Sequence, residues 1–246
     1  MEVTNPLLAL VTGVTRAEGL GYEIGRQLAQ KGMTVILTGR DLKKVEALAA
    51  QLREQRLDVL AFPLDVTNEE SVTELAREVE SRFGRLNVLV NNAGAYFDAG
   101  GTPLESDMGF VMGALETNLL GAWRTIKAFA SLLKRSGQGR IVNITSGAGT
   151  FNDPVFGMSR HPQNVPAYAI SKLALNGLTV KMAQQLKEDG VLINAVCPGF
   201  VATYPGTAEW GARPVEEGAA GIVWAATLPN DGPTGGLFRD GKALDW

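Results

Sequence analysis

The sequence has very few of the residues that build metal sites and disulfide frameworks. Its 246 residues include a single cysteine, Cys197, and a single histidine, His161. One cysteine cannot form an internal disulfide, and one cysteine with one histidine cannot complete a tetrahedral zinc site. We therefore expect no metal in this protein.

Long apolar runs and an excess of positive charge are also absent. No stretch approaches the roughly 20 apolar residues that span a bilayer. The N-terminus lacks the basic segment that begins a signal peptide, and its short apolar run leads directly into a glycine-rich stretch. Lysine and arginine number 23 against 26 aspartates and glutamates, so the net charge of -3 offers no basic field to nucleic acid. We expect a cytoplasmic protein with neither a membrane nor a nucleic acid as partner.

A serine-hydrolase nucleophile elbow is missing as well. That motif requires G-x-S-x-G at a turn between a strand and a helix. The nearest match, GMSRH around Ser159, has His161 in place of the final glycine. The sequence therefore disfavours acyl transfer by a serine nucleophile.

What the chain does contain is a regular alternation of two patterns. Short apolar, β-branched runs, which are typical of strands, alternate with amphipathic stretches of helical period. Strands that are apolar on both faces indicate a parallel sheet covered by helices on each side. The predicted strands are Leu7–Val11, Thr34–Leu37, Val59–Phe62, Asn87–Val90, Arg140–Ile144 and Val191–Val196.

This alternation predicts an α/β protein with a single domain over residues 1–246. Its core is expected to be a Rossmann-type, doubly wound parallel sheet of about seven strands with helices on both faces. Ligands of such sheets bind beyond the carboxyl ends of the strands, so motifs at those ends carry the functional argument.

Several helix boundaries are also marked in the sequence. In TNEESVTELAREVESRFG, Thr67 and Glu70 form a predicted capping box, and Gly84 ends the helix. Asp41 is predicted to cap the helix that follows the second strand, and Pro214 to open a later one.

The first strand is followed by TGVTRAEGLG, which contains Gly13, Gly19 and Gly21. A helix is predicted to begin at Gly21, and bare amides at a helix N-terminus favour a bound pyrophosphate. The spacing fits neither G-x-G-x-x-G nor a P-loop. On its own, the stretch is equally compatible with a phosphate loop and with an ordinary turn between a strand and a helix.

The end of the second strand indicates which dinucleotide would bind. An acidic residue there bonds the ribose 2′-hydroxyl of NAD, whereas an arginine accommodates the 2′-phosphate of NADP. This strand ends in Gly39 followed by Arg40, and Arg16 in the glycine loop adds a second positive charge. The less favoured alternative is that both arginines are solvated surface residues. The pattern favours NADP(H) over NAD(H).

Tyr168 and Lys172 stand four residues apart in PAYAISKLALNGL, after a proline that can begin a helix. At that spacing both side chains lie on one helical face. An ammonium about 5 Å from a phenol favours the phenolate by about 3 kcal/mol at an effective dielectric of about 20. The pair can therefore act as an acid/base catalyst, although a tyrosine and a lysine sharing a helix surface is the common case for this motif alone.

Taken together, the motifs of the chain resemble those of the short-chain dehydrogenase/reductase family, most closely its carbonyl-reductase-like members. The resemblance covers essentially the full length, and the motifs occur in the order of the family. The matching segments are Thr12-Gly13 with Gly19 and Gly21, Asp65 in LDV, NNAG at 91–94, Asn118 in TNLLG, Ser146 in NITSG, Tyr168 with Lys172, PGFVAT at 198–203 and TGGLFRDG near the C-terminus.

The resemblance implies a role for each matching residue. Tyr168 would protonate a carbonyl oxygen, and Lys172 would hold the nicotinamide ribose and lower the tyrosine pKa. Ser146 would bond the substrate carbonyl, and Asn118 would hold a water that relays protons. The implied cofactor-binding residues are Gly13, Thr15, Arg16, Gly19, Leu20, Gly21, Arg40, Asp65, Val66, Asn92, Ala93, Gly94, Tyr168, Lys172, Pro198, Gly199, Val201 and Thr203.

The sequence departs from the family pattern in two loops. Five residues separate Gly13 from Gly19, where the family usually has three, and 21 separate Ser146 from Tyr168. The second insertion, residues 151–166, is expected at the mouth of the site, with His161 as a surface residue. It looks too short to cover the dimer face as in monomeric carbonyl reductases, so we expect a homo-oligomer, either a dimer or a tetramer. Tyr204 and Trp210 are candidate walls of an open substrate site.

The sequence thus predicts an NADPH-dependent oxidoreductase that reversibly reduces a ketone or aldehyde, a small-molecule carbonyl substrate. The alternative is a non-catalytic NADP(H)-binding regulator with the same fold. Sugar epimerases share the Tyr/Lys motif, but only 74 residues follow Lys172, which leaves little room for their larger substrate domain.

Overall fold

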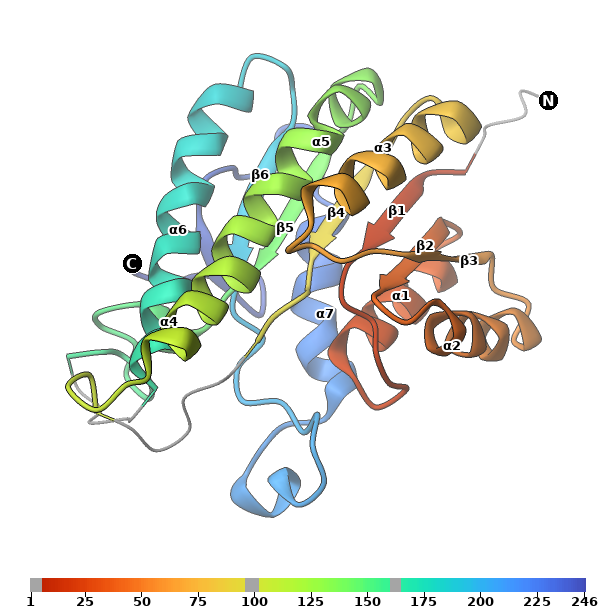
Figure 1. The fold of residues 1–246 in the computed structure, drawn as a ribbon. Coiled ribbons are helices and arrows are strands. Elements are labelled where there is room, and N and C mark those ends of the chain that lie inside the picture. Colours follow the sequence, from red (N-terminus) through yellow and green to blue (C-terminus); the bar gives the residue numbers. More distant parts are fainter. Residues whose placement is uncertain (1–5, 96–101, 160–164) are drawn as a thin grey trace.

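The computed structural model describes residues 6–95, 102–159 and 165–246 (Figure 1). His161 and its immediate neighbours therefore lie outside the described residues. Within the described parts, the chain forms one eight-stranded sheet. Its strands are β1 (Leu8–Val11), β2 (Thr34–Gly39), β3 (Val59–Pro63), β4 (Val88–Asn91), β5 (Arg140–Ile144), β6 (Leu192–Val196), β7 (Leu237–Arg239) and β8 (Lys242–Ala243).

The strand order is β3-β2-β1-β4-β5-β6-β7-β8, and all neighbours are parallel except β7 and β8. The order reverses at β1, which pairs with β2 on one side and β4 on the other. This is a doubly wound sheet, so the predicted fold class is confirmed. The six strands predicted individually are all present within two residues of their expected bounds; the antiparallel β8 was not predicted.

Helices cover both faces of the sheet (Figure 1). Helices α3, α5 and α6 lie on one face, and α1, α2 and α7 lie on the other. The helices are α1 (Leu20–Gln30), α2 (Leu42–Glu54), α3 (Glu69–Phe83), α4 (Met108–Leu115), the π-helix η1 (Glu116–Gly121), α5 (Ala122–Arg135), the 3-10 turn η2 (Gly147–Gly149), α6 (Pro166–Leu186), the 3-10 turn η3 (Thr207–Trp210) and α7 (Val215–Ala226).

The alternation of side chains along each strand builds two hydrophobic cores. In β1, Ala9 and Val11 pack with α1, α2 and α7, whereas Leu8 and Leu10 pack with α3, α5 and α6. All four residues are at most 3% exposed. A strand buried on both faces reads as a continuous apolar run, which explains why the sequence revealed these strands.

The capping prediction for α3 was wrong in its residue. The N-cap is Asn68, whose side chain accepts a hydrogen bond from the Ser71 N–H at 3.1 Å. The Thr67 hydroxyl instead donates to Asp65 Oδ1 at 2.7 Å. Because the Thr67 side chain is engaged in the local turn at Asp65, it does not cap α3, and the next residue, Asn68, is the cap instead. The predicted Asp41 cap of α2 and the left-handed Gly84 at the end of α3 are both confirmed.

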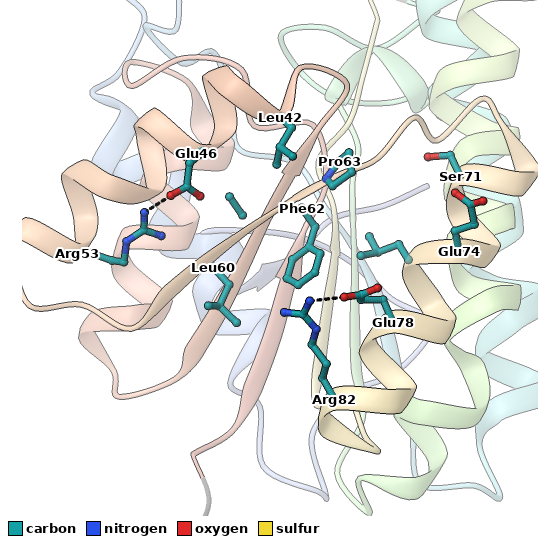
Figure 2. Close-up of a pocket in the computed structure, with 12 residues that line it drawn as sticks. Leu42, Glu46, Arg53, Leu60, Phe62, Pro63, Ser71, Glu74, Glu78 and Arg82 are labelled. Atoms are coloured by element: carbon teal, nitrogen blue, oxygen red, sulfur yellow. Dashed lines mark hydrogen bonds and ion pairs between the residues drawn. The ribbon is translucent and has the colours of Figure 1, made fainter.

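A groove runs along the open edge of the sheet, between β3 and the flanking helices α2 and α3 (Figure 2). Leu60 and Phe62 of β3 form its floor, and the ion pairs Arg53–Glu46 and Arg82–Glu78 border it. Strands β2, β1 and β4 separate this edge from β5. The groove is therefore remote from Ser146. Among the described residues, no helix combines the length and apolar character needed to cross a membrane.

Candidate active site

Residues that are far apart in sequence meet at one edge of the sheet. The carboxyl ends of β1 to β6 all point to this edge, because these strands are parallel. Each is followed by a predicted site residue: Gly13 after β1, Arg40 after β2, Asp65 after β3, Asn92 after β4, Ser146 after β5 and Pro198 after β6.

The first loop is locked to the loop that follows β4. Gly13 has φ +72, and a Cβ there would lie 2.5 Å from the Ala93 Cα, so only glycine fits. The Asn92 amide donates to the Thr12 carbonyl at 2.7 Å and to the Gly13 carbonyl at 3.2 Å. The Thr12 hydroxyl accepts from the N–H groups of Asn92 and Ala93. Asn92 and Ala93 thus shape the glycine loop.

Helix α1 begins at Leu20, one residue before the predicted Gly21. Its N-cap, Gly19, has no side chain to accept from the first-turn N–H groups. A Cβ on Gly21 would lie 2.5 Å from the Asn92 amide nitrogen, which shows how closely the two loops approach. Uncapped N–H groups and the helix dipole suit an anion such as a pyrophosphate.

Two arginines flank this loop. The Arg16 guanidinium carbon lies 3.9 Å from the centroid of the Tyr204 ring. Its Nε is buried without a hydrogen-bond partner among the described residues, a feature that suits a phosphate acceptor. Arg40 is exposed at the end of β2. A Cβ on Gly39 would lie 2.8 Å from the Val14 carbonyl oxygen, so an acidic side chain does not fit there.

The loop after β3 is ordered by Asp65. Its Oδ1 accepts from the Thr67 N–H at 3.0 Å and from the Thr67 hydroxyl, while the Asp65 N–H donates to the Ser71 hydroxyl at 3.1 Å. Val66 is buried against Gly121 of η1. Asp65 therefore uses one carboxylate oxygen to hold its own loop.

The remaining predicted cofactor-binding residues vary in exposure. Thr15 is exposed, and Val201 is buried. Gly94 is also exposed, and the partly buried residues are Leu20, Pro198, Gly199 and Thr203. Trp210, a predicted wall of the substrate site, is 75% exposed on η3.

Asn118 lies in the π-helix η1 and is fully buried. Its Oδ1 accepts from the Ala95 N–H at 2.8 Å, and its Nδ2 donates to the Ala95 carbonyl at 3.0 Å and to the Ser171 hydroxyl at 2.9 Å. A Cβ on Gly94 would lie 3.5 Å from Asn118 Oδ1 and 3.8 Å from Lys172 Nζ, so these two groups converge there. Single π-turns within α-helices often occur at functional sites.

Lys172 is a buried cation in α6. It is 4% exposed, and its Nζ donates to the Ile144 carbonyl at 2.8 Å. Burial lowers the Lys172 pKa from 10.5 to about 8, against an opposing effect of nearby Cys197. The Nζ lies 5.7 Å from the centroid of the Tyr168 ring, so the two side chains share one face of the helix.

Ser146 follows β5 and begins the turn η2. Its hydroxyl oxygen accepts from the Ala148 N–H at 3.2 Å. The turn is seated on α6: a Cβ on Gly149 would lie 2.7 Å from the Lys172 Cβ, and the Asn176 amide donates to the Gly149 carbonyl at 2.9 Å. The turn of Ser146 therefore rests on the helix that carries Tyr168 and Lys172.

Sequence reasoning missed Ser171 as part of this arrangement. Its hydroxyl donates to the Tyr168 carbonyl at 2.7 Å and accepts from the Asn118 amide. Ser171 thereby links η1 to the first turn of α6. A serine three residues after Tyr168 on a buried helix face was the available signal.

The doubly wound sheet and the glycine loop before α1 are typical of dinucleotide-binding proteins, and comparison with known proteins identifies the family of this chain. The sequence profile of the short chain dehydrogenase family matches residues 7–211. The chain is 33% identical over 302 aligned positions to (+)-neomenthol dehydrogenase of Arabidopsis thaliana, covering 99% of both proteins. It is 32% identical over 279 positions to the NADPH carbonyl reductase 3 of Rattus norvegicus, covering 97% of this chain and 98% of the rat protein.

The structural comparison agrees with these matches. The NADPH-bound carbonyl reductase from chicken fatty liver superimposes with a TM-score of 0.82 at 26% identity, covering 98% of this chain and 100% of the other. This chain belongs to the short chain dehydrogenase family, a family of oxidoreductases that bind a nicotinamide cofactor.

Proposed function

We propose that this protein is an NADPH-dependent reductase of ketones or aldehydes, reversible in the alcohol direction, with residues 1–246 forming one catalytic domain. The observation that carries the proposal is the buried Lys172 ammonium, 5.7 Å from the Tyr168 ring and held by the Ile144 carbonyl. Burying an ammonium costs free energy, and buried groups with perturbed pKa values cluster at functional sites. The position of Lys172 beside a phenol therefore supports a role in acid/base catalysis.

Each of the four polar residues has a distinct role in this proposal. Tyr168 gives its phenolic proton to the substrate carbonyl oxygen, and the Lys172 ammonium favours the phenolate that remains. Ser146 bonds the carbonyl oxygen, and Asn118 orders the end of the β4 loop beside Lys172. A bound nicotinamide supplies the hydride, and the protein provides position and protons.

The arginines support NADP(H) as the cofactor. Arg16 has a buried, unpartnered Nε, and Arg40 stands at the end of β2, where Gly39 leaves no space for a ribose-binding acid. Gly13, Gly19 and Gly21 would admit the pyrophosphate, and Asn92 to Gly94, Asp65 and the Pro198–Thr203 loop would surround the remainder. The NADPH named for the rat and chicken relatives points in the same direction.

The decisive experiment measures NADPH oxidation over a panel of ketones and aldehydes, with NADH in parallel. Turnover is expected with NADPH, and Tyr168→Phe is expected to reduce kcat by about 100-fold or more because it lacks the proton. The variant should bind NADPH with nearly unchanged affinity. Normal turnover in Tyr168→Phe would contradict the proton-donor role, whereas tight NADPH binding without any turnover in the wild type would favour the regulator.

We also propose a homo-oligomer. Large apolar side chains are exposed on each of α4, α5 and α6: Met108 is 66% exposed, Met112 57%, Trp123 42% and Ile170 49%. Exposed apolar surface of this kind is typical of an interaction face.

A further inference from the structure

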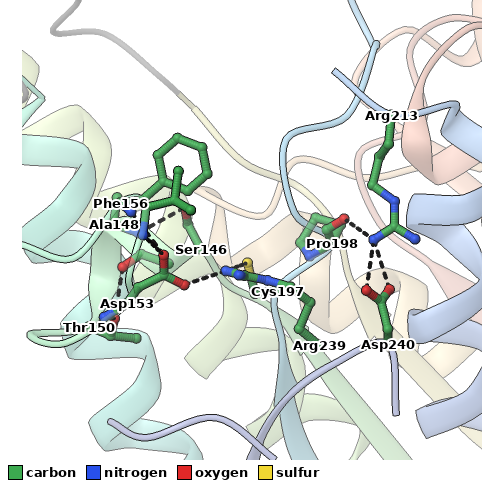
Figure 3. Close-up of polar contacts among 12 residues, drawn as sticks. Ser146, Ala148, Thr150, Asp153, Phe156, Cys197, Pro198, Arg213, Arg239 and Asp240 are labelled. Carbon is green, nitrogen blue, oxygen red and sulfur yellow. Dashed lines mark hydrogen bonds and ion pairs between the residues drawn. The ribbon is translucent and has the colours of Figure 1, made fainter. Parts of the chain in front are cut away.

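Two adjacent residues of the C-terminal hairpin, Arg239 and Asp240, contact two different loops (Figure 3). The Arg239 Nη2 donates to Asp153 Oδ2 at 2.5 Å and to Cys197 Sγ at 3.1 Å. Asp240 accepts from Arg213 Nη1 at 2.8 and 3.0 Å. The first pair joins β7 to the segment inserted after Ser146, and the second joins the hairpin to the end of the loop that follows β6.

The two pairs differ greatly in burial. The Asp153 side chain is 1% exposed and the Arg239 side chain 19%, against 49% for Asp240 and 25% for Arg213. An exposed ion pair contributes little, because water and salt screen it. A buried pair fixes its partners strongly, because removing one of them leaves a charge without compensation.

All the contacts of Asp153 hold it in one orientation. Its Oδ1 accepts from the N–H groups of Val155 at 2.9 Å and Phe156 at 2.8 Å, and its Oδ2 accepts from Arg239. Burial raises the Asp153 pKa, but the N–H groups of Phe156 and Val155 and the Arg239 guanidinium outweigh burial and lower it overall. The carboxylate is therefore charged at neutral pH and caps the turn at the start of the inserted segment.

The ion pair lies directly against the turn that begins at Ser146. A Cβ on Gly147 would lie 2.5 Å from Asp153 Oδ2 and 2.9 Å from Arg239 Nη2, so glycine alone permits this approach. The Thr150 hydroxyl, at the end of the same turn, accepts from the Asp153 N–H at 3.2 Å and donates to the Gly147 carbonyl at 2.9 Å. The turn is thus held between α6 on one side and the ion pair on the other.

We propose that Asp153 and Arg239 are positioning residues for Ser146, holding its hydroxyl at the substrate carbonyl and anchoring the described start of the inserted segment, residues 151–159, against the turn that begins at Ser146. This inference rests on the proposed reductase function for its effect on catalysis, but its structural part stands independently. Neither residue touches the substrate in this proposal; both act through the turn from Gly147 to Thr150.

A double-mutant cycle between Ser146→Ala and Asp153→Asn tests the proposal. Asparagine keeps an oxygen for the Val155 and Phe156 N–H groups and removes the charge facing Arg239. We expect Asp153→Asn alone to lower kcat by about 10- to 100-fold through misplacement of Ser146, with NADPH affinity unchanged. In the Ser146→Ala background, it should lower kcat no further, because its effect passes through the missing hydroxyl. Additive losses would overturn the proposal.

Two further variants separate positioning from simple destabilisation. Arg239→Lys should retain more activity than Asp153→Asn, because it keeps a positive charge facing Asp153, and Arg239 makes its contacts through Nη2 while its Nε has no partner among the described residues. Glu78→Gln removes an exposed ion pair at the remote β3 edge and is the matched control, with unchanged kcat.

Amide hydrogen exchange gives a readout that does not depend on turnover. The Ala148 N–H, which donates to Ser146 Oγ, should exchange faster in Asp153→Asn than in the wild type or Glu78→Gln. If the wild type reduces no carbonyl but this exchange still accelerates, the proposed function fails and the positioning contact stands. Unchanged exchange in a folded Asp153→Asn protein would refute the contact itself.

Discussion

At the scale of single residues, Lys172 shows how this protein places a charge where water is excluded. Its ammonium is held by one backbone carbonyl, and the neighbouring side chains from Tyr168 and Cys197 provide no carboxylate to compensate it. The folded state therefore holds the proton of Lys172 less tightly than the unfolded chain, whose lysine pKa is near 10.5. A buried charge of this kind reduces the stability of the fold, which is the expected cost of the catalytic role proposed for Lys172.

The pH dependence of stability tests this view of Lys172. Between pH 8 and 10.5 the unfolded state binds more protons than the folded state, so the free energy of unfolding should rise with pH. From pH 7.5 to 9.5, we expect a contribution of about 2 kcal/mol from this group. Urea unfolding of the wild type and of Lys172→Met at both pH values measures this contribution, which is the difference between the two proteins in how the free energy of unfolding changes with pH. Equal pH slopes in the two proteins would show that the ammonium is not destabilised by burial.

Arg40 gives a second prediction at this scale, about cofactor choice. Arg40→Asp replaces an attractive charge by a repulsive one at the end of β2, so KM for NADPH should rise about 10- to 100-fold while KM for NADH stays within about threefold. Steady-state kinetics with both cofactors measures this ratio. The control is Lys242→Asp, an exposed charge on β8. If the ratio is unchanged in Arg40→Asp, the 2′-phosphate is held by another group, and Arg16→Ala is the next variant.

At the scale of secondary-structure elements, the proposed function depends on where helices begin and end and on the π-helical turn η1. Helix α1 begins without a side-chain cap, and the proposed function uses this terminus for the pyrophosphate. The π-helix η1 carries Asn118, which bonds to Ala95 and Ser171, and α6 carries Tyr168 in its first turn, two residues after Pro166. By contrast, α3 is fully capped, with Asn68 at its start and the left-handed Gly84 at its end.

Two glycines in open space, Gly84 and Gly177, test backbone conformation at a helix end and helix propensity within a helix without altering packing. Gly84 has φ +69, whereas Gly177 lies within α6, and no atom lies within 4 Å of a Cβ built at either position. Gly84→Ala should lower the free energy of unfolding by about 1 kcal/mol, because alanine is strained in the left-handed region. Gly177→Ala should raise it by about 0.5–1 kcal/mol through the greater helix propensity of alanine. Shifts of the same sign in urea unfolding would contradict this assignment.

At the scale of the whole molecule, different parts of the surface carry different features. The carboxyl edge gathers the candidate site residues, and the open β3 edge carries the groove bordered by ion pairs (Figure 2). Helices α4, α5 and α6 expose apolar side chains. The C-terminal hairpin then connects the two loops that flank the site.

The exposed apolar layer predicts association between copies of the chain. Sedimentation is expected to give a dimer or tetramer, and Met112→Glu should weaken it because a charge on an apolar interface is costly to bury. Leu42→Glu is the matched control, since Leu42 is 43% exposed at the β3 groove on the opposite edge. A monomeric wild type, or equal dissociation in both variants, would show that α4, α5 and α6 do not form the interface.

The parts of the fold that the sequence determined are those set by local spacing. Strands buried on both faces appear as apolar runs, and a four-residue step places Tyr168 and Lys172 on one helical face. Parallel strands also fix the edge at which their terminal residues gather. The periodicity of the backbone fixes each of these features, so they can be predicted without knowing which distant residues are in contact.

Other features were decided only by tertiary structure. The cap of α3 went to Asn68 because Asp65 engaged Thr67, and the packing of Gly39 against the Val14 carbonyl excludes an acid there. Asp153 and Arg239 are 86 residues apart, and nothing in their local sequences joins them. Chain periodicity encodes which face a side chain takes, whereas the contacts of a buried charge depend on which segments the completed fold brings within reach.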